Sequence, residues 1–315
     1  MNRVYEGEVI TPMFIAGANP NQAELRATSL KGVLRFWWRT LNGQLPIQVL
    51  HEEEAKLFGS AGQGQGKLRI KVIDNQLKAS KEPFPKPPTQ DESKREAFTI
   101  NILDYLAYGT QKAKKFIKEY LEPGQFQVRL SYPPEIESAI NNSLYMLSNF
   151  GGLGARSRNG YGSLSFNSPN FSMPPAEFLK SLSLPQGKMQ YTALSQGLKL
   201  FRTRKLHDSW DGALAELGVA YRNARLSLEP KHEFNKRKFV ALPLADKMAH
   251  RRAKPYFMHV SRVDGKYEGR ILFLPASFCA GLELDKNTLH YMDLEFAEVC
   301  SMMNEHLSKT LEVVL

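Results

Sequence analysis

The chain has 315 residues, of which 42% are hydrophobic, and its 42 Lys and Arg against 32 Asp and Glu give a formal net charge of +10. This length predicts about two domains, and the charge favours a polyanionic partner over a neutral small molecule. No uncharged run approaches the roughly 18 residues of a membrane span, and the opening MNRVYEGEV has no signal-peptide core, so we expect a cytoplasmic protein without a membrane anchor.

The first half alternates predicted strands and helices. Alternating apolar residues predict strands over 4–11, 67–73, 125–131 and 164–166. Helical spacing predicts helices over 28–41, 102–121 and 136–147. Residues 14–27 have turn chemistry, and residues 78–97, with four prolines and dense charge, are expected to form an exposed loop or a disordered insertion.

The second half repeats this pattern after a proline-containing connector at 169–175. Helices are predicted over 177–183 and 208–225, and strands over 257–263 and 270–274. Short strands that alternate with amphipathic helices in both halves predict the α+β class with two domains, residues 1–167 and 168–315. The acidic tail, residues 283–312, is expected to face solvent or a basic neighbour.

The first predicted helix, SLKGVLRFWWR, combines an apolar stripe with a basic row. Lys31, Arg35 and Arg39 are spaced by four, so they stack along one side of a helix, with Trp38 beside them. No acid occurs between Glu24 and Glu52 to pair with these cations. The row could contact phosphates while a tryptophan stacks on a base, or it could be a solvated face with Trp37 and Trp38 in core or subunit contacts.

Residues 150–163, FGGLGARSRNGYGS, form a glycine-rich loop with two arginines. No Lys-Ser/Thr follows the second glycine of a phosphate loop, and the third glycine of a dinucleotide loop is absent. The remaining interpretation is a loop whose backbone N–H groups approach an RNA phosphate while Arg156 and Arg158 reach along the strand. A plain surface turn would need fewer glycines.

Basic clusters with interleaved aromatics continue in the second half, in LFRTRKLHDSW, EFNKRKF and HRRAKPYF. Residues 199–254 carry 14 Lys and Arg against 6 Asp and Glu, which favours a contact with single-stranded RNA there. Catalytic and metal motifs are missing: the histidines form no HExxH, and the two cysteines form no metal-ligand pattern. His207-Asp208 is the one weak candidate for acid–base catalysis.

Four strings occur in this order: TPMFIAGA, ELRATSLKGVLRFWWR, LFGSAGQGQGKLRI and NFGGLGARSRNGYGS. With them the chain resembles the RAMP proteins of type III CRISPR-Cas effector complexes, and most of all the type III-B (Cmr) subunit that binds the crRNA 3′ end. The resemblance covers residues 1–166, and in the second half it rests chiefly on RRAKPYFMHVSRVDGKYEGRILFLP.

The resemblance implies two ferredoxin-like (RRM-like) domains with antiparallel sheets and packed helices. It implies a non-catalytic, cofactor-free RNA-binding subunit of an antiviral ribonucleoprotein, which caps the crRNA 3′-end side and contacts guide and target RNA beside other Cmr-type subunits. The RNA-binding residues expected from the resemblance and the basic patterns together are Arg26, Lys31, Arg35, Trp38, Arg39, Gly152, Gly154, Arg156, Arg158, Tyr161, Arg251 and Arg252.

Two other functions stay open at this point. Metal-independent endoribonucleases that process precursor crRNA share this fold and a glycine-rich loop, but their loop lies near the C-terminus beside a histidine- or lysine-based site. Here the loop ends at residue 163, which favours a binding subunit. The third possibility is a scaffold whose tryptophans and acidic tail make protein contacts only.

Overall fold

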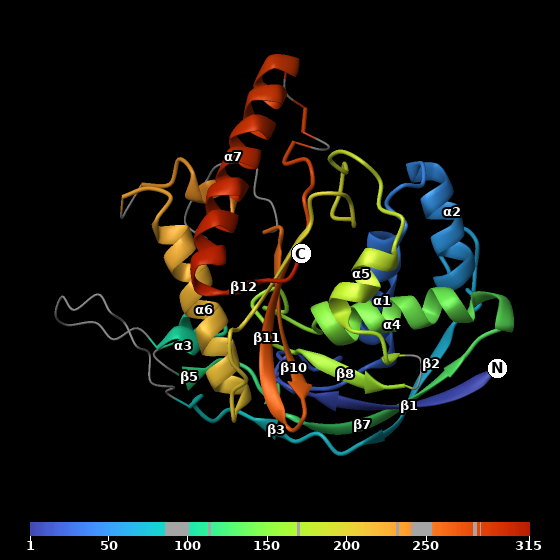
Figure 1. Ribbon diagram of the computed structural model, residues 1–315. Coiled ribbons are helices and arrows are strands. Elements are labelled where there is room, and N and C mark those ends of the chain that lie inside the picture. The colour runs from blue at the N-terminus through green and yellow to red at the C-terminus, as the bar shows by residue number, and fades with distance from the viewer. Residues whose placement is uncertain are drawn as a thin grey trace.

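The computed structural model describes residues 1–85, 101–112, 115–168, 171–230, 233–240, 254–279, 282–283 and 285–315. Two four-stranded antiparallel sheets form its framework, one in each half of the chain (Figure 1). Two helices of the first half, α1 and α4, lie between the two sheets, and the long helices of the second half, α6 and α7, cover the far side of the second sheet.

The first sheet has the strand order β2-β7-β1-β8, and its chain order is β-α-β-β-α-β. Its elements are β1 Asn2–Val9, α1 Ala27–Leu41, α2 Ile47–Phe58, β2 Arg69–Asn75, β7 Gly124–Ser131, the short 3-10 helix η1 Pro134–Ile136, α4 Glu137–Phe150 and β8 Leu164–Asn167. Alternation turns Tyr5, Phe126 and Val128 toward α1 and α4, and leaves the other face of the sheet open. The strands and helices predicted at these positions are confirmed.

The second sheet repeats the same arrangement with the strand order β10-β11-β9-β12. Its elements are β9 Lys199–Arg202, α6 Trp210–Leu226, the 3-10 helix η3 Arg237–Phe239, β10 Tyr256–Val263, β11 Lys266–Phe273, α7 Lys286–Thr310 and β12 Glu312–Val313. The turn between β10 and β11 uses Asp264 and Gly265, both with positive φ (50° and 78°), as a tight hairpin requires.

The second sheet is covered on both faces. Phe257, Leu272 and Leu200 lie in register and face α1 and α4 of the first half. On the other face, Met258 and Ile271 pack beneath α6 and α7. Each of the two apolar clusters therefore combines residues from both halves of the chain.

The helix predicted over 102–121 is wrong beyond its first turn and a half. Only α3, Ile102–Leu106, is helical, because Gly109 turns the chain with φ +87°. Short strands follow: β4 Gln111–Lys112 pairs with β5 Lys115–Phe116, and β6 Tyr120–Leu121 pairs with β3 Ala79–Ser80. Within the expected exposed loop at 78–97, residues 78–85 are described, and Phe84 there is buried. Residues 86–97 lie outside the described residues.

The expectation that the tail at 283–312 faces solvent or a basic neighbour is wrong for one of its faces. Its greater part is the 25-residue helix α7, which buries Phe296, Val299, Cys300, Met303 and Leu307 at helical spacing against α6 and the second sheet. Glu298 and Glu305 are exposed, whereas Asp293 faces inward and accepts from the Ser277 hydroxyl and the Phe278 N–H. A further short helix, α5 Pro175–Ser181, covers the first core and confirms the start of the helix predicted over 177–183.

Candidate nucleic-acid interface

The glycine-rich loop is fastened between the two sheets. Ala155 forms a β-bridge with Phe14, and Asn159 forms one with Met258 of β10. The Met258 N–H donates to the Arg158 carbonyl at 3.2 Å. The loop therefore belongs to the junction between the halves.

The glycines of this loop make room for the protein itself. Gly162 has φ +64°, and a Cβ there would collide with the Leu153 carbonyl. Gly154 has φ +95° and faces the Phe14 carbonyl, while a Cβ on the buried Gly152 would lie 2.8 Å from the Tyr161 carbonyl oxygen. Protein backbone thus fills the side where a Cβ would lie at Gly152 and Gly154, although Gly154 itself is exposed, and the approach of an RNA phosphate to these two residues stays a prediction.

Tyr161 was expected at the RNA surface, and the structure places it in the core. Its side chain is fully buried, the hydroxyl donates to the Leu103 carbonyl at 2.7 Å, and its ring stacks on Phe84 with 5.3 Å between centroids. Burial raises the pKa of this phenol well above its usual value. Tyr161 therefore anchors the loop.

Arg158 is held in position by aromatic rings. Its guanidinium carbon lies 4.3 Å from the centroid of Phe257 and 5.8 Å from that of Phe36, and Nη1 donates to the Lys254 carbonyl. Desolvation lowers its pKa to about 10, so the side chain keeps its charge near neutral pH. A stacked guanidinium with one edge hydrogen-bonded is preorganised to meet a phosphate with its other edge.

Two further cations converge on the same place. Lys254 Nζ is buried 4.2 Å from the Tyr221 ring centroid, without a hydrogen-bond partner. Arg225 Nη1 donates to the Tyr105 hydroxyl at 2.6 Å, while its buried Nε has no partner. Burial, then repulsion from Arg158, Arg225 and Arg156, lowers the pKa of Lys254 well below its usual value.

Within the described ranges, Arg158, Arg225 and Lys254 form no ion pair, so positive charge accumulates beside the loop. Arg156 contributes to the same field, in a left-handed conformation with φ +63°. Sequence reasoning missed Arg225 and Lys254, although HRRAKPYF marks the second. Its predicted members Arg251 and Arg252 lie outside the described residues.

The basic row of α1 is partly neutralised. Glu54 of α2 accepts from Arg35 Nε at 2.8 Å and from Arg39 Nη1 at 2.7 Å. The prediction that the row lacks acidic partners is therefore wrong, because the acid comes from the next helix. One carboxylate between two arginines still leaves a net positive charge, and Lys31 has no ion-pair partner among the described residues.

The other predicted residues of α1 divide between surface and core. Arg26 is the half-buried N-cap residue of the helix. Trp38 is buried edge-to-face against Phe58, so it cannot stack on a base as expected. Gly32 is exposed, and a Cβ at this position would have no described atom within 4 Å. Because glycine weakens a helix without any packing reason here, the position favours close approach of a ligand.

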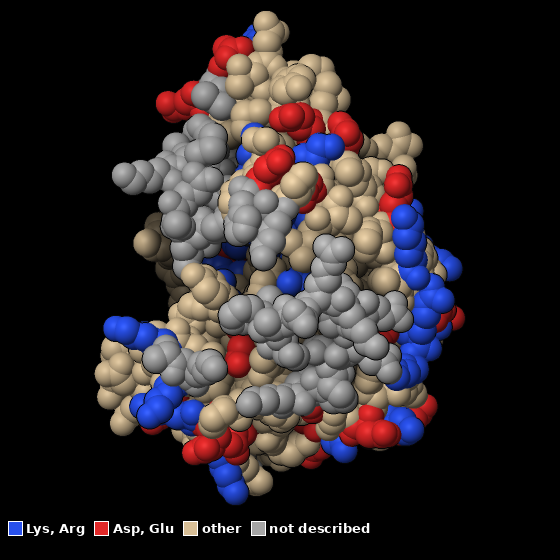
Figure 2. Space-filling view, turned by 90° about the vertical axis from the view of Figure 1, so that its left-hand side faces the viewer, with Lys and Arg blue, Asp and Glu red and all other residues tan. Residues whose placement is uncertain are grey.

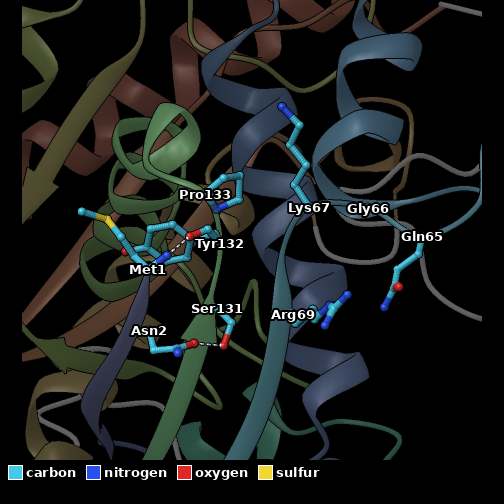
Figure 3. Close-up of a pocket in the computed structure, with 9 residues that line it drawn as sticks. All are labelled: Met1, Asn2, Gln65, Gly66, Lys67, Arg69, Ser131, Tyr132 and Pro133. Carbon is cyan, nitrogen blue, oxygen red and sulfur yellow. Dashed lines mark hydrogen bonds between the residues drawn. The ribbon is translucent and has the colours of Figure 1, made fainter.

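A second basic place lies at the corner of the open sheet face. A pocket of about 410 Å³ lies there. Its lining includes Asn2 of β1, Arg69 of β2, Ser131 of β7 and Lys67 just before β2 (Figure 3). Ser131 Oγ donates to Asn2 Oδ1 at 2.6 Å, and Lys67 pairs with Glu135 at 3.0 Å. Tyr132 is the aromatic residue among those that line this pocket, and it is buried. The lining residues that the structure describes therefore offer no exposed ring on which a base could stack.

Acid–base and metal chemistry find little support. His207 Nε2 lies 2.7 Å from Glu216, and Asp208 pairs with Lys266, so the His-Asp dipeptide is split between partners. In the part of the chain that the structure describes, no group of His, Cys, Asp and Glu could hold a metal ion, and no helix is long and apolar enough to cross a membrane.

Figure 2 shows Lys and Arg on the α3 and α6 side in separate groups with acids between them.

Comparison with known proteins assigns the family. The RAMP superfamily model matches residues 6–165. The CRISPR system Cmr subunit Cmr1-2 of Pyrococcus furiosus is 32% identical over 176 residues, covering 51% of this chain and 92% of that relative. Its Cmr1-1 is 33% identical over 146 residues, covering 45% of this chain and 40% of that relative.

Solved structures share the fold. The apo crystal structure of Cmr1 from Pyrococcus furiosus superposes with a TM-score of 0.64 and 21% identity, covering 99% of this chain and 98% of that one. A chain of the type III-B Cmr-beta complex bound to cognate target RNA gives 0.50 and 12%, covering 95% and 99%. The chain belongs to the RAMP superfamily, as a relative of the Cmr1 subunits of type III-B CRISPR systems.

Proposed function

We propose that this chain is a non-catalytic RNA-binding subunit of a type III-B CRISPR ribonucleoprotein, which caps the crRNA 3′-end side and contacts guide and target RNA. The observation that carries the proposal is that Arg158 and Arg225 lie beside the glycine-rich loop, around the buried Lys254, with no acidic partner among the described residues. Like charges held together at low dielectric are repelled, and a polyanion relieves that repulsion.

The basic row of α1 extends this surface. Phe36 touches the Arg158 guanidinium on one side and belongs to the same helix as Lys31, Arg35 and Arg39. We define the RNA-binding surface by six residues of α1 and the loop: Lys31, Arg35, Phe36, Arg39, Arg156 and Arg158. That a related fold occurs in a Cmr complex bound to target RNA supports the proposal.

The same proposal includes two ferredoxin-like domains that meet near residue 167, in a cytoplasmic protein. The repeated chain order and the repeated strand order of the two sheets support this division. The apolar interior that the halves share supports domains that move as one body. The proposed partners are crRNA, target RNA and the other Cmr-type subunits.

Removal of two partly exposed charges tests the RNA-binding surface. Lys31→Gln and Arg156→Asn remove charge outside the apolar core, and asparagine tolerates the left-handed backbone of residue 156. In fluorescence anisotropy with single-stranded RNA, the double variant should bind more weakly. Its slope of log K against log salt should fall by about 1.4, about 0.7 for each lost phosphate contact.

Arg69→Gln, at the corner of the open sheet face, is the matched control and should leave the slope unchanged. Equal affinities and slopes for the folded double variant and the parent would refute binding at this surface. A lower slope in Arg69→Gln alone would move the RNA to the open sheet.

One observation favours precursor crRNA cleavage as a second candidate, since Lys254 has a lowered pKa and lies beside three arginines. Its Nζ is buried against Tyr221, however, where no 2′-hydroxyl reaches it. Repeat RNA incubated with the chain in EDTA should stay intact. Site-specific cleavage that Lys254→Met abolishes would replace the binding proposal with a nuclease.

A further inference from the structure

A pocket of about 350 Å³ lies where α1 meets the start of α2 and the segment before β9. It is lined by Phe36, Arg39, Ile47, Leu50, Tyr191 and Thr192. Trp38, the residue expected to stack on a base, does not line it. The two aromatic rings that line it, those of Phe36 and Tyr191, come from opposite halves of the chain. Only the fold brings them together.

The walls of this pocket are apolar and only partly shielded. Phe36 and Tyr191 are half-buried, and Ile47 is 60% exposed. Leu50 forms a fully covered floor. The Tyr191 hydroxyl donates to the Gly43 carbonyl at 3.4 Å, which ties this side chain to the segment after α1. A pocket lined mainly by apolar and aromatic side chains, with a few polar groups, is typical of a small-ligand site.

Two arginines lie near the pocket. Arg39 lines the pocket with its side chain 39% exposed, and Glu54 holds the guanidinium through Nη1. Arg158 lies on the side toward the glycine-rich loop, 5.8 Å from the ring centroid. One helical turn before Phe36, the open position of Gly32 leaves room for a chain to pass over α1.

We propose that this pocket holds one unpaired base of the bound single-stranded RNA, stacked on Tyr191 and Phe36, with Arg39 and Arg158 at the flanking phosphates. The inference rests on the proposed function and adds to it a site for a base. Aromatic walls between two arginines match the alternation of base and phosphate along a single strand. An apolar side chain of a neighbouring subunit would not need the flanking positive charge.

Base stacking and phosphate binding can be measured separately. The full chain is titrated with a single-stranded RNA that carries 2-aminopurine at each position in turn, and one position should show quenched fluorescence. Tyr191→Leu should abolish that quenching and weaken binding about tenfold, with the salt slope unchanged. Tyr191→Phe keeps the ring and should behave like the parent.

An RNA with an abasic residue at the quenched position completes a double-mutant cycle. The parent should bind the abasic RNA about tenfold more weakly than the intact RNA. Tyr191→Leu should bind the abasic and the intact RNA equally well, because it has already lost the stacking contact. If the parent binds RNA with its full salt slope and no position is quenched, this inference fails and the proposed function stands. If the parent binds no RNA, both fail. If Tyr191→Leu instead loses a partner subunit while quenching persists, the pocket is a protein contact.

Discussion

Nδ1 of His259, on β10, lies 2.6 Å from the carbonyl oxygen of Gly151, the residue that ends α4. This hydrogen bond joins the second sheet to the start of the glycine-rich loop, within a fully buried site. The imidazole must donate from Nδ1, since the carbonyl can only accept. Burial, followed by repulsion from Arg270, lowers the pKa of His259 to about 3. A neutral histidine therefore fastens the two halves together.

The first prediction is that acid weakens the fold through His259. Its folded pKa of about 3 lies below the unfolded value of 6.5, so unfolding takes up a proton. Its stability contribution is therefore complete above pH 6.5 and is lost as the pH falls toward 3. Between pH 7 and pH 5 the free energy of unfolding should drop by about 2 kcal/mol from this residue.

Urea denaturation at the two pH values measures this loss. His259→Asn keeps an N–H donor near the Gly151 carbonyl and does not titrate, so its loss between pH 7 and pH 5 should be smaller by about 2 kcal/mol. The exposed His290, changed to Asn, is the control and should keep the parent's dependence. Identical pH dependence in His259→Asn and the parent would contradict the role assigned to the imidazole.

The second prediction concerns Glu54 and has opposite signs for stability and binding. Glu54→Gln removes the counter-charge of Arg35 and Arg39, whose side chains are 32% and 39% exposed. We expect a loss of about 1–2 kcal/mol in unfolding free energy, less than for a fully buried pair because water screens the arginines. Affinity for single-stranded RNA at low salt should rise, since net positive charge on α1 increases.

Chemical denaturation and anisotropy on the same preparation test both signs. Glu53→Gln, one position earlier in the exposed pair with Lys56, is the control and should change neither quantity by more than about 0.5 kcal/mol. Weaker RNA binding in folded Glu54→Gln would mean that the arginine geometry, rather than the charge, serves the RNA.

The third prediction separates two glycines with different purposes. Gly162→Ala forces a Cβ against the Leu153 carbonyl at φ +64°, and should cost more than about 2 kcal/mol in unfolding free energy. Gly32→Ala lies mid-helix in open space and should stabilise the fold by about 0.5–1 kcal/mol. Thermal denaturation compares them. If folded Gly32→Ala also binds RNA normally, the backbone at Gly32 is not in contact with the ligand.

Helix α1 shows what could be predicted from the sequence. Its apolar stripe and basic row obey helical spacing, so both the helix and the grouping of Lys31, Arg35 and Arg39 follow from local pattern. Its partners do not. Glu54 lies in the next helix, α2, beyond a loop. No local pattern in the sequence indicates that its carboxylate binds two arginines of α1.

Aromatic residues show the same limit. A tryptophan or tyrosine within a basic motif has the composition of a stacking surface, but composition does not say which face another element covers. Trp38 is covered by Phe58, and Tyr161 by Phe84 from a segment expected to be exposed. Phe36 and Tyr191, in contrast, are only half-buried. Only tertiary packing decides between these pairs.

The last prediction tests the tail, whose acidic composition concealed its apolar face. Met303 is fully buried on α7, and Met303→Ala should lower the unfolding free energy by about 2–4 kcal/mol, because it leaves a cavity between α6, α7 and the second sheet. Glu305→Ala, two residues on and exposed, should change it by less than about 0.5 kcal/mol. Urea denaturation of both variants decides. If the tail only faced solvent or a neighbouring subunit, the isolated chain would tolerate both substitutions equally. If α7 is part of the core, Met303→Ala lowers the unfolding free energy much more than Glu305→Ala does, because the apolar face of the helix packs against the sheet.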